Sequence, residues 1–263
     1  MLVLPLALLL STTPPAVMGW AGRACTTPKQ TPQSTMDLKV REEEHAECLR
    51  KAMGRALDKV LASAKAGAAG KRPTPALAGQ VLALQADYER WVSDACAVME
   101  EVTWMDVSTG ERFMGTGYGL TRSECQQRQF AWRGFYLDVW ARGEWSALGP
   151  VFEAQGGAAR TARQFLLDHR TQVQRAASLA PAHGAAAALP GRKLSQADWS
   201  LYLERLARVL SAPESLARRQ CEVLPSAAQP TAEACVQRFA DSLLAPLDFP
   251  ESARAASRRP ASP

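Results

Sequence analysis

Six cysteines carry the clearest chemistry in this chain of 263 residues: Cys25, Cys48, Cys96, Cys125, Cys221 and Cys235. An even number of cysteines in an exported chain is typical of disulfides, whereas cysteine thiolates grouped with histidines bind zinc. His45 and Cys48 have the spacing of a ligand pair on one helix face, but no second pair of comparable spacing follows. The sequence therefore favours disulfides and predicts no metal site.

The expected helices suggest how the cysteines pair. Apolar periodicity predicts long helices over residues 35–66, 74–102 and 121–145. In an antiparallel bundle, Cys96 and Cys125 lie within about two turns of the ends of one interhelical loop, so they are the natural first pair. Elimination gives the second pair, and the last two cysteines close a smaller loop across another hairpin. The expected disulfides are Cys96–Cys125, Cys25–Cys48 and Cys221–Cys235.

Catalytic motifs are missing from the sequence. The only histidines are His45, His169 and His183, which lie in a helix, in a charged helix and in a linker. There is no Gly-x-Ser-x-Gly elbow, phosphate-binding loop or His-Glu-x-x-His pair. The acidic run 42–44 stands at a helix start, where acids are usually solvated and interact favourably with the helix dipole. We therefore assign no catalytic or cofactor-binding residue and predict a protein that is not an enzyme; the alternative is an envelope hydrolase with scattered catalytic residues.

An amphipathic helix stands out in the stretch LQADYERWVSDAC, residues 84–96. Its apolar positions recur every three or four residues, as on the packed face of a helix: Val81, Leu84, Tyr88, Trp91, Ala95, Val98 and Val102. Gln85 adjoins this face, and we expect it to form an interhelical hydrogen bond rather than a ligand contact. The large aromatic residues are expected in the core: Trp91, Trp132, Phe135, Tyr136 and Trp140. Because the sequence has no run of alternating β-branched residues bounded by turns, the chain is predicted to be all-α, a disulfide-stapled antiparallel helical bundle with a second small helical hairpin region.

The N-terminus predicts export. Residues 2–10 are almost wholly apolar and small residues precede Cys25, which is typical of a signal peptide, here residues 1–24. Pro5, Pro14 and Pro15 argue against a buried helix start. No later stretch has the length of a transmembrane span. We therefore expect a periplasmic or secreted bacterial protein; lipoprotein anchoring at Cys25 is the alternative, although only Ala24 fits a lipid-attachment motif.

Composition divides the rest of the chain. Residues 25–148 form the expected first helical domain, and residues 149–179 a helical connector broken at Gly156–Gly157. An Ala/Pro/Gly linker follows over 180–194. Ser195 and Asp198 then open a second helical hairpin region, 195–247, with capping chemistry. Residues 248–263 are polar and are expected to be a disordered tail.

Several residues give the first domain a family resemblance. It resembles the LprI-type lysozyme-inhibitor domain, an exported helical family, over about residues 25–145. The interval from Gln85 to Cys96 is the specific part of the likeness. The other residues that carry it are Leu57, Asp58, Tyr88, Trp91, Gly115, Thr116, Gly117, Cys125 and Arg133. The resemblance implies a binding protein with lysozyme as a partner; Gln85, Tyr88, Trp91 and Arg133 are taken as structural.

The loop between Cys96 and Cys125 is the expected contact with such a partner. Animal-type lysozymes are cationic, and this segment gathers acids together with aromatic anchors. The candidate contact residues are Glu100, Glu101, Trp104, Asp106, Glu111, Phe113 and Tyr118. The alternative is that the aromatic residues cap the bundle and the acids are merely solvated.

The overall charge is a second guide to partners. The formal net charge is +5 and the isoelectric point about 9.0, but the basic residues are spread along the chain. This pattern predicts no nucleic-acid binding and at most a weak attraction to anionic envelope surfaces. A structural or assembly protein of the bacterial envelope is the alternative to a lysozyme inhibitor.

Overall fold

The computed structural model describes residues 13–26, 31–66, 75–113, 115–180, 192–224 and 231–249. The α-helices in these ranges are α1 Pro15–Ala24, α2 Thr35–Ala66, α3 Pro75–Trp104, α4 Leu120–Arg142, α5 Gly149–Leu179, α6 Gln196–Val223 and α7 Ala232–Leu244. A short 3-10 helix, η3 Trp145–Leu148, links α4 to α5. The all-α prediction is confirmed.

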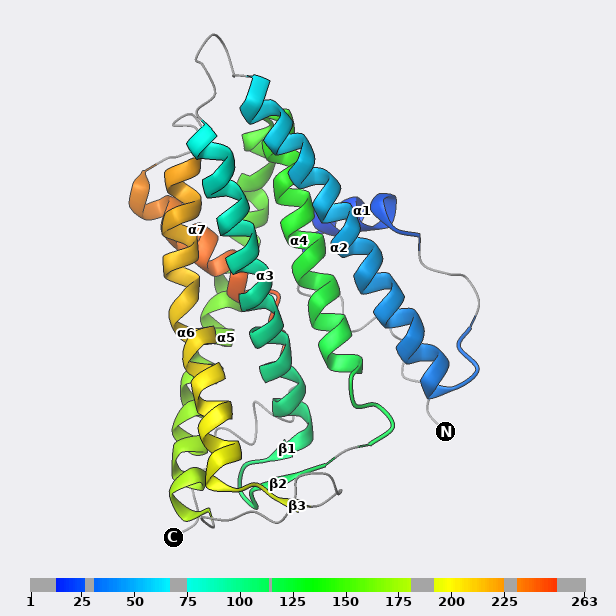
Figure 1. Ribbon diagram of the computed structural model, residues 1–263, viewed down its shortest axis with the longest axis vertical. Coiled ribbons are helices and arrows are strands. Elements are labelled where there is room, and N and C mark those ends of the chain that lie inside the picture. Colours follow the sequence, from blue (N-terminus) through cyan, green and yellow to red (C-terminus); the bar gives the residue numbers. More distant parts are fainter. Residues whose placement is uncertain are drawn as a thin grey trace.

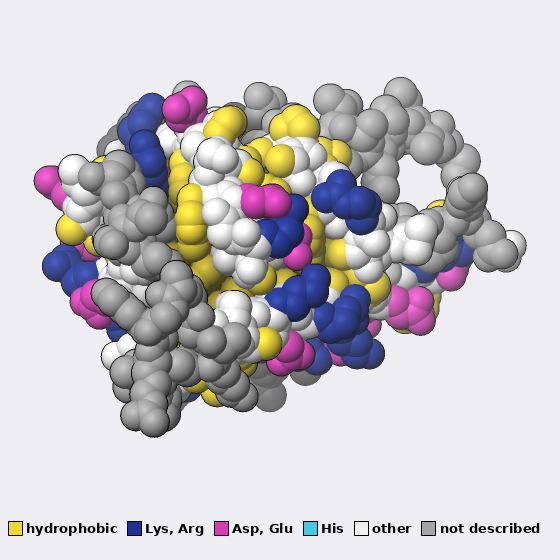
Figure 2. Space-filling view, turned by 90° about the horizontal axis from the view of Figure 1, so that it is seen from above, with side chains coloured by type: hydrophobic (Ala, Val, Ile, Leu, Met, Phe, Trp, Pro, Cys, Tyr) yellow, Lys and Arg dark blue, Asp and Glu magenta, His cyan; other side chains and the backbone are white. Residues whose placement is uncertain are grey.

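Five long helices, α2 to α6, run side by side along the long axis, and the shorter α7 runs obliquely across them (Figure 1). Helix α4 packs along α2 and α3, and α6 packs against α3, α5 and α7. The predicted apolar face of α3 is buried along its whole length, from Val81 at 0% exposure to Val102 at 7%. Figure 2 looks onto one end of the bundle, where apolar side chains lie among charged and other polar ones.

The two halves of the chain share one core. The Trp91 indole Nε1 donates to the Val209 carbonyl at 3.2 Å, and Gln129 Nε2 donates to the Leu243 carbonyl at 3.0 Å. Buried apolar residues from every helix form one continuous cluster. The sequence boundaries at 148 and 194 therefore do not separate independent cores, because α6 and α7 cover the face of α3 and α4 that would otherwise be exposed.

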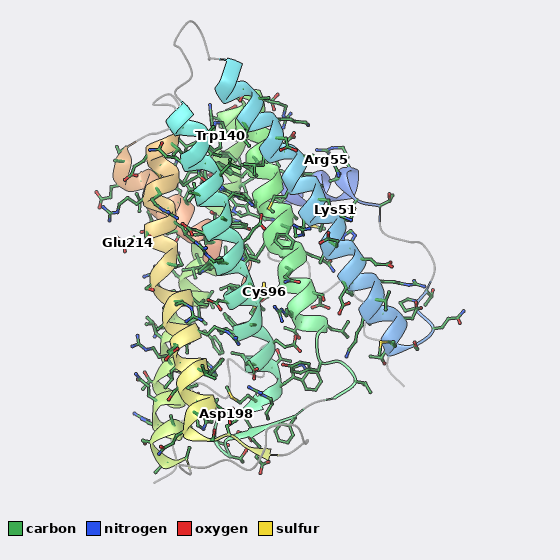
Figure 3. All side chains as sticks on the ribbon, in the orientation of Figure 1. Lys51, Arg55, Cys96, Trp140, Asp198 and Glu214 are labelled. Carbon is green, nitrogen blue, oxygen red and sulfur yellow. A yellow bond between two sulfur atoms is a disulfide. The ribbon has the colours of Figure 1, made fainter. Side chains whose placement is uncertain are left out.

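In the second half of the chain, the structure corrects two local predictions and confirms a third. Helix α5 is continuous through Gly156–Gly157, because packing on α6 and α7 outweighs the weak helix preference of glycine. The predicted tail started too early, since Phe249 is 2% exposed and stacks on Phe165 with ring centroids 4.3 Å apart. The rest of the predicted tail, residues 250–263, lies outside the described residues. The predicted cap is confirmed: Ser195 and Asp198 form a capping box at the start of α6, at the lower end of the molecule in Figure 3.

Helix α1 falls within the segment that the sequence assigned to a signal peptide. Pro14 is its N-cap and Pro15 its first residue, positions at which proline needs no hydrogen-bond partner. The two prolines therefore begin a buried helix rather than exclude one, contrary to expectation. Val17 is 0% and Trp20 8% exposed. Residues 1–12 lie outside the described residues, so the export signal itself stays a prediction.

All six cysteines are paired as expected, in Cys25–Cys48, Cys96–Cys125 and Cys221–Cys235. The pairing of Cys25 leaves it no thiol for lipid attachment, which argues against the lipoprotein alternative. Three disulfides are typical of proteins from oxidising compartments. Among the helices of the described residues, none is both long enough and apolar enough to cross a bilayer.

Candidate functional site

The segment between α3 and α4 is organised by a small antiparallel sheet. Strands β1 Met105–Asp106, β2 Glu111–Arg112 and β3 Arg192–Lys193 lie side by side in that order. We call residues 105–119 the α3–α4 loop. The backbone of Phe113 donates to the Trp104 carbonyl at 2.7 Å, which fixes the point at which the chain leaves the sheet. The loop is thus anchored to the start of α6 as well as to α3.

A tight turn joins β1 to β2. Asp106 Oδ1 accepts hydrogen bonds from the Ser108 amide at 2.8 Å and from Ser108 Oγ at 2.6 Å. These bonds lower the pKa of Asp106, the Ser108 side chain contributing most. Gly110 then takes a φ of 70°, a left-handed conformation that suits glycine. The Asp106 carboxylate is therefore occupied in holding the turn.

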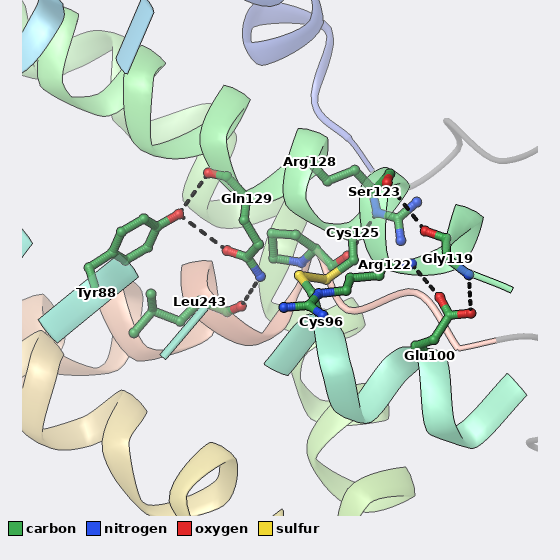
Figure 4. The surroundings of a disulfide bond; sticks show 11 residues. Tyr88, Cys96, Glu100, Gly119, Arg122, Ser123, Cys125, Arg128, Gln129 and Leu243 are labelled. Carbon is green, nitrogen blue, oxygen red and sulfur yellow. Dashed lines mark hydrogen bonds between the residues drawn. A yellow bond between two sulfur atoms is a disulfide. The ribbon is translucent and has the colours of Figure 1, made fainter. Parts of the chain in front are cut away.

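Glu100 and the disulfide Cys96–Cys125 form the base of the loop (Figure 4). The Glu100 carboxylate accepts the backbone N–H groups of Gly119 and Arg122, each at 2.7 Å. These two donors are at the N-terminus of α4, where helix amides lack partners within the helix. Glu100 is 2% exposed, so it caps a helix from inside the protein.

Glu101 holds the loop from the other side. Its Oε2 accepts from Arg112 Nε at 2.9 Å, and the glutamate is 6% exposed. Burial raises the pKa of Glu101, although Arg112 acts in the opposite direction. The pair links the last turn of α3 to β2.

Aromatic side chains cover the outer part of the loop. The Trp104 and Tyr118 rings lie with centroids 6.3 Å apart. A Cβ atom at Gly115 would lie 2.8 Å from Trp104 Cζ3, so glycine permits the backbone to lie flat against the indole. Phe113 packs less closely and is 44% exposed.

The structure brings only some of the predicted contact residues to the surface. Glu100 and Glu101 belong to α3 and are buried, which corrects their placement in an exposed acidic loop. Each carboxylate accepts hydrogen bonds from groups inside the protein. Residues Trp104, Asp106, Glu111 and Tyr118 are partly exposed, and Phe113 is exposed. The reachable surface of the loop is thus more aromatic than acidic.

The residues assigned structural roles meet in the core. Gln85 Oε1 accepts from Arg133 Nε at 3.0 Å, and Gln85 Nε2 donates to Glu89 Oε1 at 3.0 Å. The Tyr88 hydroxyl donates to the Gln129 carbonyl at 2.7 Å. This confirms the expected interhelical hydrogen bond of Gln85.

A buried His–Tyr pair was missed by the sequence reading. His169 Nε2 lies 2.8 Å from the Tyr202 hydroxyl and the histidine is 4% exposed. Burial lowers the pKa of His169 to about 4, so the ring is neutral at pH 7. The charged neighbours of His169 in sequence suggested a solvated face; its helical spacing from the buried Phe165 and Val173 was the signal that placed it inside.

Acid is expected to destabilise the protein through His169. Its folded-state pKa of about 4 is below the ordinary 6.5, so the unfolded chain takes up the proton first as the pH falls. The contribution of the neutral His169 to the free energy of unfolding is therefore fully present above pH 6.5 and is lost as the pH falls from 6.5 to 4. The loss amounts to about 3 kcal/mol. Urea unfolding across this range should show a much smaller dependence of stability on pH for His169→Gln. Burial also lowers the pKa of the half-buried His45, so His45→Gln should reduce this dependence less than His169→Gln does. Equal dependences in wild type and His169→Gln would exclude the mechanism.

The described residues contain no group of three His, Cys, Asp or Glu placed to hold a metal ion. The pairing of Cys48 with Cys25 also removes the one thiolate of the His45 pair. Comparisons with protein-family models, curated proteins and solved structures give no match to this chain.

Proposed function

We propose that this chain is an exported, non-catalytic binding protein that contacts a protein partner through the α3–α4 loop. The observation that carries the proposal is the bracing of this loop. A disulfide, the Glu100 cap, the Glu101–Arg112 pair and a three-stranded sheet all hold a short exposed segment. A segment held in one conformation loses little entropy on binding, which favours recognition.

Lysozyme is the first partner to test. The resemblance of the interval from Gln85 to Cys96 to LprI-type domains supports this choice. The exposed Phe113 follows the partly exposed Glu111 by two positions in the chain and offers an aromatic anchor near one acid. Because Glu100 and Glu101 are buried, attraction to a cationic enzyme rests on Asp106 and Glu111.

Replacing Phe113 by alanine is expected to weaken binding to lysozyme by about 10-fold or more, as for an aromatic anchor at the centre of an interface. Calorimetry with the full chain measures the change. Leu82→Ala is the matched control, because Leu82 is 49% exposed on α3 outside the loop. Equal affinities of the two variants would remove the loop from the interface. If the wild-type chain does not bind lysozyme, lysozyme is not the partner. A stoichiometric envelope partner that is recovered by the wild-type chain and not by Phe113→Ala would then support binding through the loop to another protein.

A further inference from the structure

Arg133 places a positive charge in the centre of the bundle. The residue is 6% exposed, and its Nε and Nη1 atoms donate to neutral amide oxygens, Gln85 Oε1 at 3.0 Å and Gln220 Oε1 at 2.6 Å. The Tyr88 and Tyr136 rings face the guanidinium, with centroids 5.1 and 5.3 Å from Cζ. The nearest acid in this network, Glu89, bonds to Gln85 and not to Arg133. Among the described residues, the charge therefore has no directly bonded counterion.

The third guanidinium nitrogen of Arg133 lacks a hydrogen-bond partner among the described residues. This atom, Nη2, is buried. A buried charged donor without a partner is strongly unfavourable, so native proteins supply an acceptor from a side chain, a water or an ion. The Tyr136 hydroxyl is a second donor of this kind: it accepts from Gln220 Nε2 at 2.8 Å, while its own proton finds no acceptor in the described part of the chain.

A cavity of about 20 Å³ lies beside these donors. Arg133, Tyr136 and Gln220 line it, together with apolar side chains that include Leu84, Leu216 and Phe239. A volume of this order is enough for one particle of roughly the size of a water molecule or a monatomic ion. The walls carry hydrogen-bond donors and a positive charge but no carboxylate, in surroundings where low dielectric strengthens electrostatic attraction.

We propose that this cavity is a binding site for a single monatomic anion, chloride under ordinary conditions, held by Arg133 Nη2 and the Tyr136 hydroxyl. The anion balances the buried guanidinium and gives both donors an acceptor. It joins α3, α4, α6 and α7 at one point, so it stabilises the contact between the two halves of the chain. This anion site is separate from the α3–α4 loop and needs no protein partner.

The test compares thermal unfolding of the full chain in sodium chloride, sodium bromide and sodium gluconate at equal ionic strength. We expect Tm to be higher in the two halides, by about 3–5 °C at ten times the dissociation constant. Tyr136→Phe keeps the ring but removes the hydroxyl, and should abolish most of this difference. Tyr202→Phe is the matched control, since it removes a buried hydroxyl that bonds to His169, and should keep the difference.

Crystals grown with bromide provide a second readout that needs no variant. An anomalous peak beside Arg133 would support the site. Equal Tm values in all three salts, or a water molecule with no anomalous signal in the cavity, would overturn it. A halide effect that survives unchanged in Tyr136→Phe would also contradict the assignment of the hydroxyl as a ligand.

Discussion

Trp20→Ala is expected to lower the free energy of unfolding by about 3–5 kcal/mol, the range for removing a large buried aromatic side chain. The Trp20 ring packs directly on Gly134 of α4, where any side chain would overlap it. Together with the buried Val17 and the disulfide Cys25–Cys48, it fixes α1 to the bundle. Chemical denaturation measures the loss, and the exposed control Met18→Ala should stay within about 0.5 kcal/mol of wild type.

Gly134→Ala separates this packing from helix preference. In an open helix position the substitution stabilises by about 0.5–1 kcal/mol, because glycine is the poorer helix former. Here we expect a loss instead, because the new methyl group displaces the indole. In the double variant Trp20→Ala with Gly134→Ala the methyl group should be neutral or favourable. A stabilising effect of Gly134→Ala in the wild-type background would mean that α1 does not pack on α4.

The same packing bears on processing of the N-terminus. If an export signal is cleaved from this chain, we expect the cut to precede α1, so that the mature protein retains Trp20. The intact mass of the protein recovered from the periplasm decides this. A mature chain that begins after Trp20 would show that the bundle exists without α1.

Glu100→Ala is expected to destabilise the protein by about 3 kcal/mol or more, since it removes two hydrogen bonds to a charged acceptor inside the protein. The amides of Gly119 and Arg122 would be left without an acceptor. Urea unfolding measures the loss, and hydrogen exchange should report faster opening at these two amides. Glu44→Ala is the control, because Glu44 is exposed on α2.

The substitution also tests the role of Glu100. If Glu100 contacted the partner, its substitution would weaken partner binding and leave stability unchanged. If Glu100 is a helix cap, its substitution lowers stability and leaves partner binding unchanged. Loss of less than about 1 kcal/mol would contradict the capping role. Charge reversal at Glu100 is therefore a poor probe of the α3–α4 loop, and Glu111 and Phe113 are better ones.

Sequence alone determined the features that depend on neighbours along the chain. The bounds predicted for α2, about residues 35–66, agree with the structure, because helical periodicity shows in spacings of three and four residues. The Cys96–Cys125 pairing followed from where these cysteines fall relative to helix ends, Cys25–Cys48 followed by elimination, and Cys221–Cys235 from the second hairpin. The cap at Ser195 and the buried face of α3 could also be predicted, because both depend on residues a few positions apart in the sequence.

Only the tertiary structure decided which polar residues are buried, because their partners are distant in sequence. Arg133 meets Gln220, which is 87 positions away, and His169 meets Tyr202 from another helix. In the sequence, Glu100 looks like a solvated acid. Only the fold brings it to the two amides at the start of α4 that it caps. Helix α1 was misread for a similar reason: its prolines are unfavourable inside a helix and suitable at its start, and the Gly134 position that receives Trp20 exists only once α4 is in place. Local spacing thus specifies the helices, whereas the satisfaction of buried polar groups and the fit of one surface on another depend on the assembled bundle.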